Sequence, residues 1–171
     1  MKQHYKVSTH YVTNQAKPGQ ILSNHLVASK LSQCNCFKSF EGQKYSPNRQ
    51  RDLSNNPLKN FPSDVFATNT KLDLLWLQDN NFPELPPDLF QDLKNLKELW
   101  LQDNNFTELP PDLFQDLKLL SLLDLSNNEI GNLPPYIFRN ITAVEFLKMD
   151  YNKIEKLHED QFQSLVELFD L

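Results

Sequence analysis

The sequence predicts a solenoid of the α/β class: equal coils stacked into a curved horseshoe, with a short-stranded parallel sheet on the concave face and irregular or 3₁₀ segments on the convex face. Two observations predict it. Leucine is concentrated in one part of the chain, with three among the first 47 residues and 26 among the remaining 124. Four segments, starting at Leu72, Leu96, Leu120 and Val144, also match at a constant offset of 24 residues, the mark of a repeat architecture.

Each repeat opens with the pattern L-x-x-L-x-L-x-x-N-x-L. In the second repeat it is met by Leu72, Leu75, Leu77, Asn80 and Phe82. The alternation of Leu and other residues within this run predicts a short strand with one buried face. The repeats occupy residues 48–171. Full copies start at residues 48, 72, 96, 120 and 144, and a partial copy starts at residue 168. Successive strands run in the same direction, so the sheet is parallel.

The asparagine at the ninth place recurs in every full repeat. A carboxamide both donates and accepts hydrogen bonds, so a buried column of amides can satisfy backbone groups where each strand turns inward. We assign this column a structural role, not a catalytic one. Its members are Asn56, Asn80, Asn104, Asn128 and Asn152.

The second half of each repeat carries Leu-Pro pairs and one phenylalanine. Proline removes a backbone donor and favours turns over a regular helix, which predicts irregular structure on the outer side. The phenylalanines are expected to stack as a second core layer. They are Phe66, Phe90, Phe114, Phe138 and Phe162.

With these motifs the chain resembles the leucine-rich repeat family, in its 24-residue class common in extracellular proteins such as Toll-like receptors, Slit and variable lymphocyte receptors. The resemblance implies a horseshoe that recognises other proteins. Residues 31–47, with Cys34-x-Cys36, resemble a degenerate form of the family's four-cysteine amino-terminal cap. No carboxyl-terminal cap follows Leu171, so the chain is expected to be a fragment, a truncated gene product or a protein that self-associates through its last coil.

Residues 1–30 are polar and are expected to be disordered, and they show no signal-peptide pattern. Residues 1–47 carry six lysines and one glutamate, whereas residues 48–171 carry 11 basic and 21 acidic side chains. A metal site built from His4, His10, His25 and the two cysteines fits no standard zinc spacing.

The side chains between the leucines should project from the concave sheet. Aromatic and aliphatic side chains rimmed by carboxylates predict a protein-binding surface, because tryptophan is a common energetic anchor. Cross-strand stiffening of the sheet is the alternative role. The candidate ligand-binding residues are Leu74, Trp76, Asp79, Glu98, Trp100, Asp103, Leu122, Asp124, Phe146, Lys148 and Tyr151.

Two N-glycosylation sequons, at Asn105 and Asn140, favour an extracellular or cell-surface location. Repeats 72–95 and 96–119 agree at 20 of 24 positions, but only the later copy carries a sequon, at Asn105. In the earlier copy Pro83 stands where the sequon needs its threonine. The alternatives are a cytosolic repeat adaptor, for which unpaired cysteines need no explanation, and a truncated product with no function of its own.

Several function classes are excluded or disfavoured. No apolar run is long enough to span a membrane. The acidic body lacks the basic stripe that binds nucleic acid and favours a basic protein or peptide ligand. No phosphate loop, nucleophile elbow or zinc motif is present, and an open sheet keeps carboxylates hydrated. We therefore predict no enzymatic activity, no catalytic residues, no cofactor and no metal.

Overall fold

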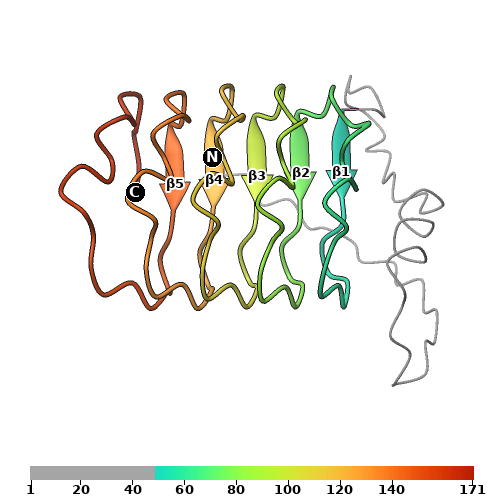
Figure 1. Cartoon of the computed structure of the whole chain (residues 1–171), viewed down its shortest axis with the longest axis horizontal. Helices are drawn as coiled ribbons and strands as arrows, with labels where there is room; N and C mark the ends of the chain where they lie inside the picture. The colour runs from blue at the N-terminus through green and yellow to red at the C-terminus, as the bar shows by residue number, and fades with distance from the viewer. Residues whose placement is uncertain (1–48) are drawn as a thin grey trace, which may run out of the picture.

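The computed structural model describes residues 49–171. The predictions for residues 1–30 and 31–47, including the cysteines and the three histidines, lie outside this part. Five strands form one parallel sheet in chain order (Figure 1). They are β1 (Gln50–Asp52), β2 (Leu74–Trp76), β3 (Glu98–Trp100), β4 (Leu122–Asp124) and β5 (Phe146–Lys148).

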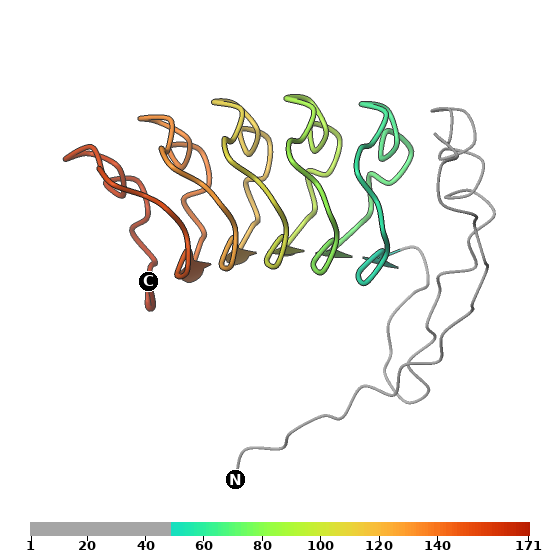
Figure 2. The ribbon, with the colours of Figure 1, turned by 90° about the horizontal axis from the view of Figure 1, so that it is seen from below.

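The register of the sheet follows the sequence repeat. Leu75 pairs with Leu99 and Leu99 with Leu123, a shift of 24 residues each time. A further parallel bridge joins Phe146 to Asp170, where the partial sixth repeat was predicted to begin its strand. The coils spread apart on the side opposite the sheet, so the sheet lies on the concave face (Figure 2). The predicted solenoid is confirmed.

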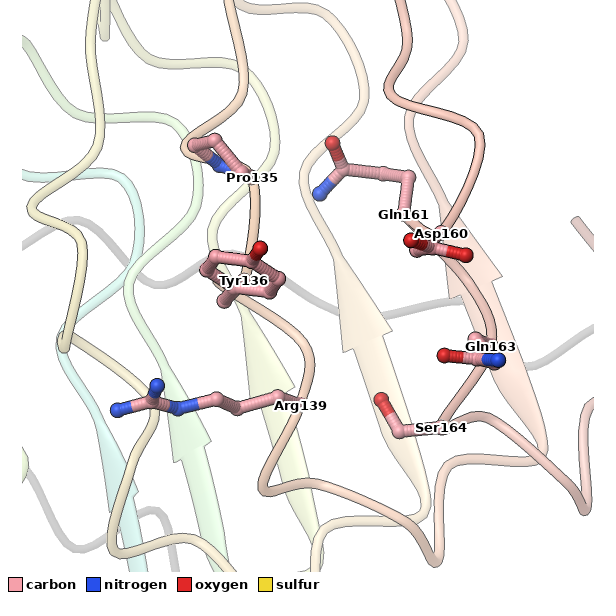
Figure 3. Close-up of a pocket in the computed structure, with 7 residues that line it drawn as sticks. All are labelled: Pro135, Tyr136, Arg139, Asp160, Gln161, Gln163 and Ser164. Carbon is pink, nitrogen blue, oxygen red and sulfur yellow. The ribbon is translucent and has the colours of Figure 1, made fainter.

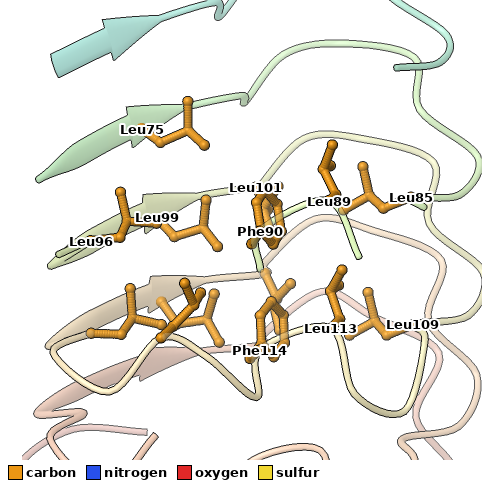
Figure 4. Packing of buried hydrophobic residues seen from close by; sticks show 14 of the residues in the cluster. Leu75, Leu85, Leu89, Phe90, Leu96, Leu99, Leu101, Leu109, Leu113 and Phe114 are labelled. Carbon is orange, nitrogen blue, oxygen red and sulfur yellow. The ribbon is translucent and has the colours of Figure 1, made fainter. Parts of the chain in front are cut away.

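The core fills the space between the sheet and the outer segments (Figure 4). Strand leucines such as Leu75 and Leu99 are completely buried, because each coil is covered by a neighbour on both sides. Stacked phenylalanine rings form the outer layer. Phe90 lies 6.4 Å from both Phe66 and Phe114, measured between ring centroids, and Phe138 lies 5.9 Å from Phe162.

The asparagine column joins each coil to the one before it. Asn104 Nδ2 donates to the carbonyl of Leu101 in its own coil, at 3.1 Å, and to that of Leu77 in the preceding coil, at 3.0 Å. Its Oδ1 accepts the backbone N–H of Phe82 at 3.3 Å. Asn80 and Asn128 repeat this arrangement. Through these bonds the asparagine column links each coil to the preceding one along the axis of the solenoid.

The convex side consists of successive turns, and the structure of residues 49–171 contains no helix. Backbone hydrogen bonds from Leu89 to the carbonyl of Pro86, and from Leu93 to that of Phe90, close two of these turns. The proline residues account for this choice, since they cannot donate to a helical ladder. No helix in the described part of the chain is long and apolar enough to cross a membrane.

Candidate functional site

One row of side chains crosses the concave sheet in register, at the fifth place of each repeat. Trp76 pairs with Trp100 on the next strand, as predicted, and both indoles are half-buried. The ring contacts recorded within residues 49–171 all join phenylalanines, so the two indoles do not stack on each other. The complete row is Asp52, Trp76, Trp100, Asp124 and Lys148.

Two charged side chains contact the indole of Trp100. Its Nε1 donates to Glu98 Oε2 at 3.2 Å. The ammonium of Lys148 lies 5.7 Å from the centre of the indole and 3.6 Å from Asp124 Oδ2, so Lys148 reaches back across β4 to the face of the ring. A cation in this position is attracted by the negative face of the indole. Sequence spacing gave no signal for this contact, because it joins residues two repeats apart.

The prediction that Asp124 projects freely into solvent is wrong. Asp124 is only 3% exposed, and its Oδ1 accepts hydrogen bonds from the backbone N–H of Ser126 at 3.1 Å and from its hydroxyl at 2.6 Å. Ser126 is buried as well. This local Asp-x-Ser turn draws the carboxylate against the backbone, and Lys148 covers it. Asp124 therefore exposes little surface, and it forms an ion pair with Lys148 at 3.6 Å.

The apolar candidates lie around the two indoles. Leu74 and Leu122 are half-buried, and Phe146 is 40% exposed at the edge nearer the carboxyl terminus. All three are the first residue of their strands and hold the third position of their repeats, two residues before the row that contains the tryptophans. We call this surface the concave patch; it comprises Leu74, Trp76, Glu98, Trp100, Leu122, Phe146 and Lys148.

A second column flanks the concave patch, at the eighth place of each repeat. All five of its residues have a positive φ between 51° and 56°, a conformation that Asn and Asp tolerate better than other side chains do. Tyr151 departs from this preference and is 78% exposed. The column is Asn55, Asp79, Asp103, Asn127 and Tyr151.

The two carboxylates of this column are adjacent. Asp79 Oδ2 accepts a long hydrogen bond of 3.4 Å from the amide of Asn55. Desolvation raises the pKa of Asp103, and the negative charges of Asp79 and Asp124 raise it further, while a hydrogen bond from Asn127 lowers it. These carboxylates make the rim of the concave patch negative, which suits a basic ligand.

Both sequons lie on the surface. Asn105 and Thr107 are exposed, and Asn140 is half-buried beside an exposed Thr142. The middle residue of each sequon, Phe106 or Ile141, is completely buried in the core.

A shallow hollow of about 330 Å³ opens between the convex turns of the last two full repeats, away from the predicted residues. Gln161 lies at its base, 2% exposed, and donates from Nε2 to the carbonyl of Pro134 (Figure 3). It occupies the place held by Leu89 and Leu113 in earlier repeats, and that break in the leucine column was a signal that sequence reasoning missed. Within residues 49–171, no three acidic, histidine or cysteine side chains are grouped to hold a metal ion.

Comparison with known proteins identifies the repeat. The sequence matches the family described as "Leucine rich repeat" in four overlapping segments, residues 52–106, 70–130, 94–154 and 120–171. Together these segments cover most of the chain. A search of curated protein sequences gave no match.

Many solved structures are similar to this chain, and three of them serve as examples. The leucine-rich repeat domain of APL1B is 22% identical, with a TM-score of 0.66, over 72% of this chain and 39% of that one. A chain in an octameric complex of Latrophilin 3, Unc5D and FLRT2 is 25% identical, with a TM-score of 0.66, over 70% of this chain and 37% of that one. A chain in the LRIM1/APL1C complex is 28% identical, with a TM-score of 0.62, over 64% of this chain and 21% of that one. This chain therefore spans well under half the length of each.

Proposed function

The chain belongs to the leucine-rich repeat family, and on that premise we propose that it is a non-enzymatic recognition module that holds a protein or peptide on its concave face. One observation carries the proposal. Both tryptophans of the chain stand on adjacent strands of the open sheet, while leucine and phenylalanine fill the core. Tryptophan in such a place supplies large contact area with little loss of conformational freedom.

Two further features support this function. The structures to which the chain is similar include two protein complexes. The concave patch also combines apolar side chains with a carboxylate rim, the anatomy of a binding surface with an apolar centre and a polar edge. The acidic rim favours a basic ligand and a salt-sensitive association rate.

A peptide library displayed on phage tests the proposal. Peptides selected on the immobilised chain are measured against the double variant Trp76→Ala, Trp100→Ala, and against Tyr136→Ala as a matched control. Tyr136 is also an exposed aromatic residue, at 63%, but it lies on the convex side. We expect the double variant to weaken binding more than tenfold and the control to leave it unchanged. The opposite ranking would move the binding surface to the convex side.

We further propose an extracellular or cell-surface location, on the strength of the two sequons. Asn105 and its Thr107 are both exposed, so a glycan there would leave the core undisturbed. Mass spectrometry of the protein from its natural source should find glycan on Asn105 or Asn140. Unmodified asparagines at both places, together with free thiols at Cys34 and Cys36, would favour the cytosolic alternative.

A further inference from the structure

The hollow between the convex turns of the fourth and fifth repeats contains a buried acceptor that lacks a donor. Gln161 Nε2 donates to the carbonyl of Pro134, but Gln161 Oε1 accepts no hydrogen bond from any described residue. The side chain is 2% exposed and lines the hollow. Figure 3 shows its amide directed toward Pro135 on the preceding turn. A buried carbonyl without a donor is destabilising, so a ligand that brings an N–H group here supplies a hydrogen bond that the described residues do not.

The internal repeat shows that packing does not require glutamine at this place. Gln161 holds the eighteenth position of its repeat, where the earlier copies carry apolar side chains. Three of these, Leu89, Leu113 and Ile137, are buried in the core. An aliphatic side chain therefore fills the same place in the earlier coils and leaves no polar atom unpaired.

The surface around the hollow also departs from the repeat, in its charge. At the seventeenth and twenty-first positions the second and third repeats carry only aspartate, as Asp88, Asp92, Asp112 and Asp116. The fourth and fifth repeats, which enclose the hollow, carry Tyr136, Asn140, Asp160 and Ser164 at the same positions. Among the residues that line the hollow, the charge of Arg139 balances that of Asp160. The hollow is therefore neutral beside an acidic stretch of the convex side, which favours an uncharged polar ligand.

The lining of the hollow suits a sugar ring. Tyr136 offers an exposed aromatic face, on which the C–H groups of a pyranose can stack. Gln163 and Ser164 add an amide and a hydroxyl, so donors and acceptors are both present for the sugar hydroxyls. Ser164 Oγ donates to the carbonyl of Phe138 at 3.1 Å, which fixes its oxygen as an acceptor. A volume of about 330 Å³ lies at the lower end of the usual range of ligand sites, so the ligand is small.

We propose that this hollow binds an N-acetylated sugar such as N-acetylglucosamine, whose acetamido N–H donates to Gln161 Oε1 while its ring lies on Tyr136. The sequon at Asn140 favours a sugar over a peptide. Asn140 follows Arg139 in the chain and holds the position in its repeat that Ser164 holds in the next, so a glycan on Asn140 begins at the edge of the hollow. The sugar is either part of that glycan, on the premise of the proposed extracellular location, or part of another molecule.

Saturation-transfer NMR on the full chain made in bacteria, without N-glycan, tests the proposal. The probe is N,N′-diacetylchitobiose, and the matched control is cellobiose, which has the same linkage with hydroxyl groups in place of the acetamido groups. We expect saturable transfer to the acetamido methyl groups, and an affinity for the probe about two- to tenfold above that for cellobiose, the range of one net hydrogen bond. Equal affinities, or no saturable transfer to the probe, would overturn the proposal.

Two variants assign the binding to the hollow. Gln161→Leu restores the residue type of the earlier repeats, so it should fold and should bind the two disaccharides equally. Tyr136→Ala should weaken both by about two- to tenfold, because the sugar loses its aromatic face. A preference for the acetamido sugar that survived Gln161→Leu would refute the assignment. Tighter binding of an uncharged N-acetylated peptide amide would refute it too, because the hollow would then be a peptide site.

A further arm identifies the source of the sugar. Asn105→Gln made in mammalian cells keeps Asn140 as the sole sequon, and an endoglycosidase trims its glycan to one N-acetylglucosamine. If that sugar fills the hollow, the free probe no longer binds, and Asn140→Gln restores its binding. If the probe binds with and without the glycan, the hollow takes a sugar of another molecule. Either result supports the site.

The sugar site and the concave function are tested independently of each other. The double variant Trp76→Ala, Trp100→Ala should bind the probe like the wild type, and Gln161→Leu should bind the library peptides like the wild type. Loss of sugar binding in the tryptophan variant would place the sugar on the concave sheet and overturn the proposal for the hollow.

Discussion

Replacing Asn104 with alanine should destabilise the whole array, because this one amide joins two coils. It donates to Leu77 in the preceding coil and to Leu101 and Gln102 in its own, and it accepts from the N–H of Phe82. The residue is 7% exposed, so water has little access to replace these bonds. Alanine at this place leaves the buried N–H of Phe82 without its acceptor.

The cost follows from what each lost bond leaves behind. The carbonyls of Leu77 and Leu101 each keep one other amide donor, from Asn80 and Asn128 respectively, so each loses only the net value of a bond, about 0.5–1.5 kcal/mol. The orphaned N–H of Phe82 costs about 1–3 kcal/mol. These three contributions sum to a loss of about 2–6 kcal/mol in the free energy of unfolding.

Urea denaturation followed by circular dichroism measures this loss. The neighbouring exposed Asn105→Ala serves as the control, expected to change stability by less than about 0.5 kcal/mol. Asn56, in the first coil, is an exposed member of the column, so Asn56→Ala should lower the free energy of unfolding by an amount between those of Asn104→Ala and Asn105→Ala. Asn104→Asp should be at least as damaging at neutral pH, since a carboxylate cannot donate, and should recover partly in acid. If Asn104→Ala behaved like Asn105→Ala, the amide column would not hold the coils together.

Three other perturbations follow from the structure. Phe90→Ala should cost about 3–5 kcal/mol in thermal or urea unfolding, because a completely buried ring between two others leaves a cavity; a loss below 1 kcal/mol would contradict the stacked layer. Tyr151→Asn should stabilise the fold by about 1 kcal/mol, since Asn tolerates the φ of 55° and the exposed ring loses little packing; destabilisation would show that the ring packs. Because the pKa of Asp103 is raised in the folded protein, its ionised form destabilises the native state. The contribution of Asp103 to wild-type stability therefore increases as pH falls through the folded pKa. Asp103→Asn should therefore be more stable than wild type at neutral pH and lose that advantage below the usual aspartate pKa; an advantage independent of pH would refute the assignment.

Sequence periodicity was sufficient to predict the sheet, its register and the amide column. A constant spacing of 24 residues leaves one way to stack the coils, so Leu75, Leu99 and Leu123 had to meet. The side-by-side placement of the two tryptophans follows from the same register.

Contacts that depend on side-chain conformation were not predictable in this way. The burial of Asp124 comes from a turn with Ser126, which alternation along a strand does not encode. Lys148 reaches Trp100 two strands away, because its long stem spans the short side chain of Asp124. Gln161 is buried because its repeat position is internal, despite its polarity. At the place of Gln161, position in the repeat therefore determined burial more than residue type did.

The interchangeable coils have a consequence for how the gene can change. Because residues 72–95 and 96–119 differ at only four positions and present matching upper and lower surfaces, unequal recombination between them adds or removes one complete coil. The column asparagine of an added coil can donate to the strand carbonyl of the coil before it, as Asn80 donates to Leu53 and Asn104 to Leu77. Array length can thus vary across generations in steps of 24 residues, and each added copy brings another tryptophan to the inner surface.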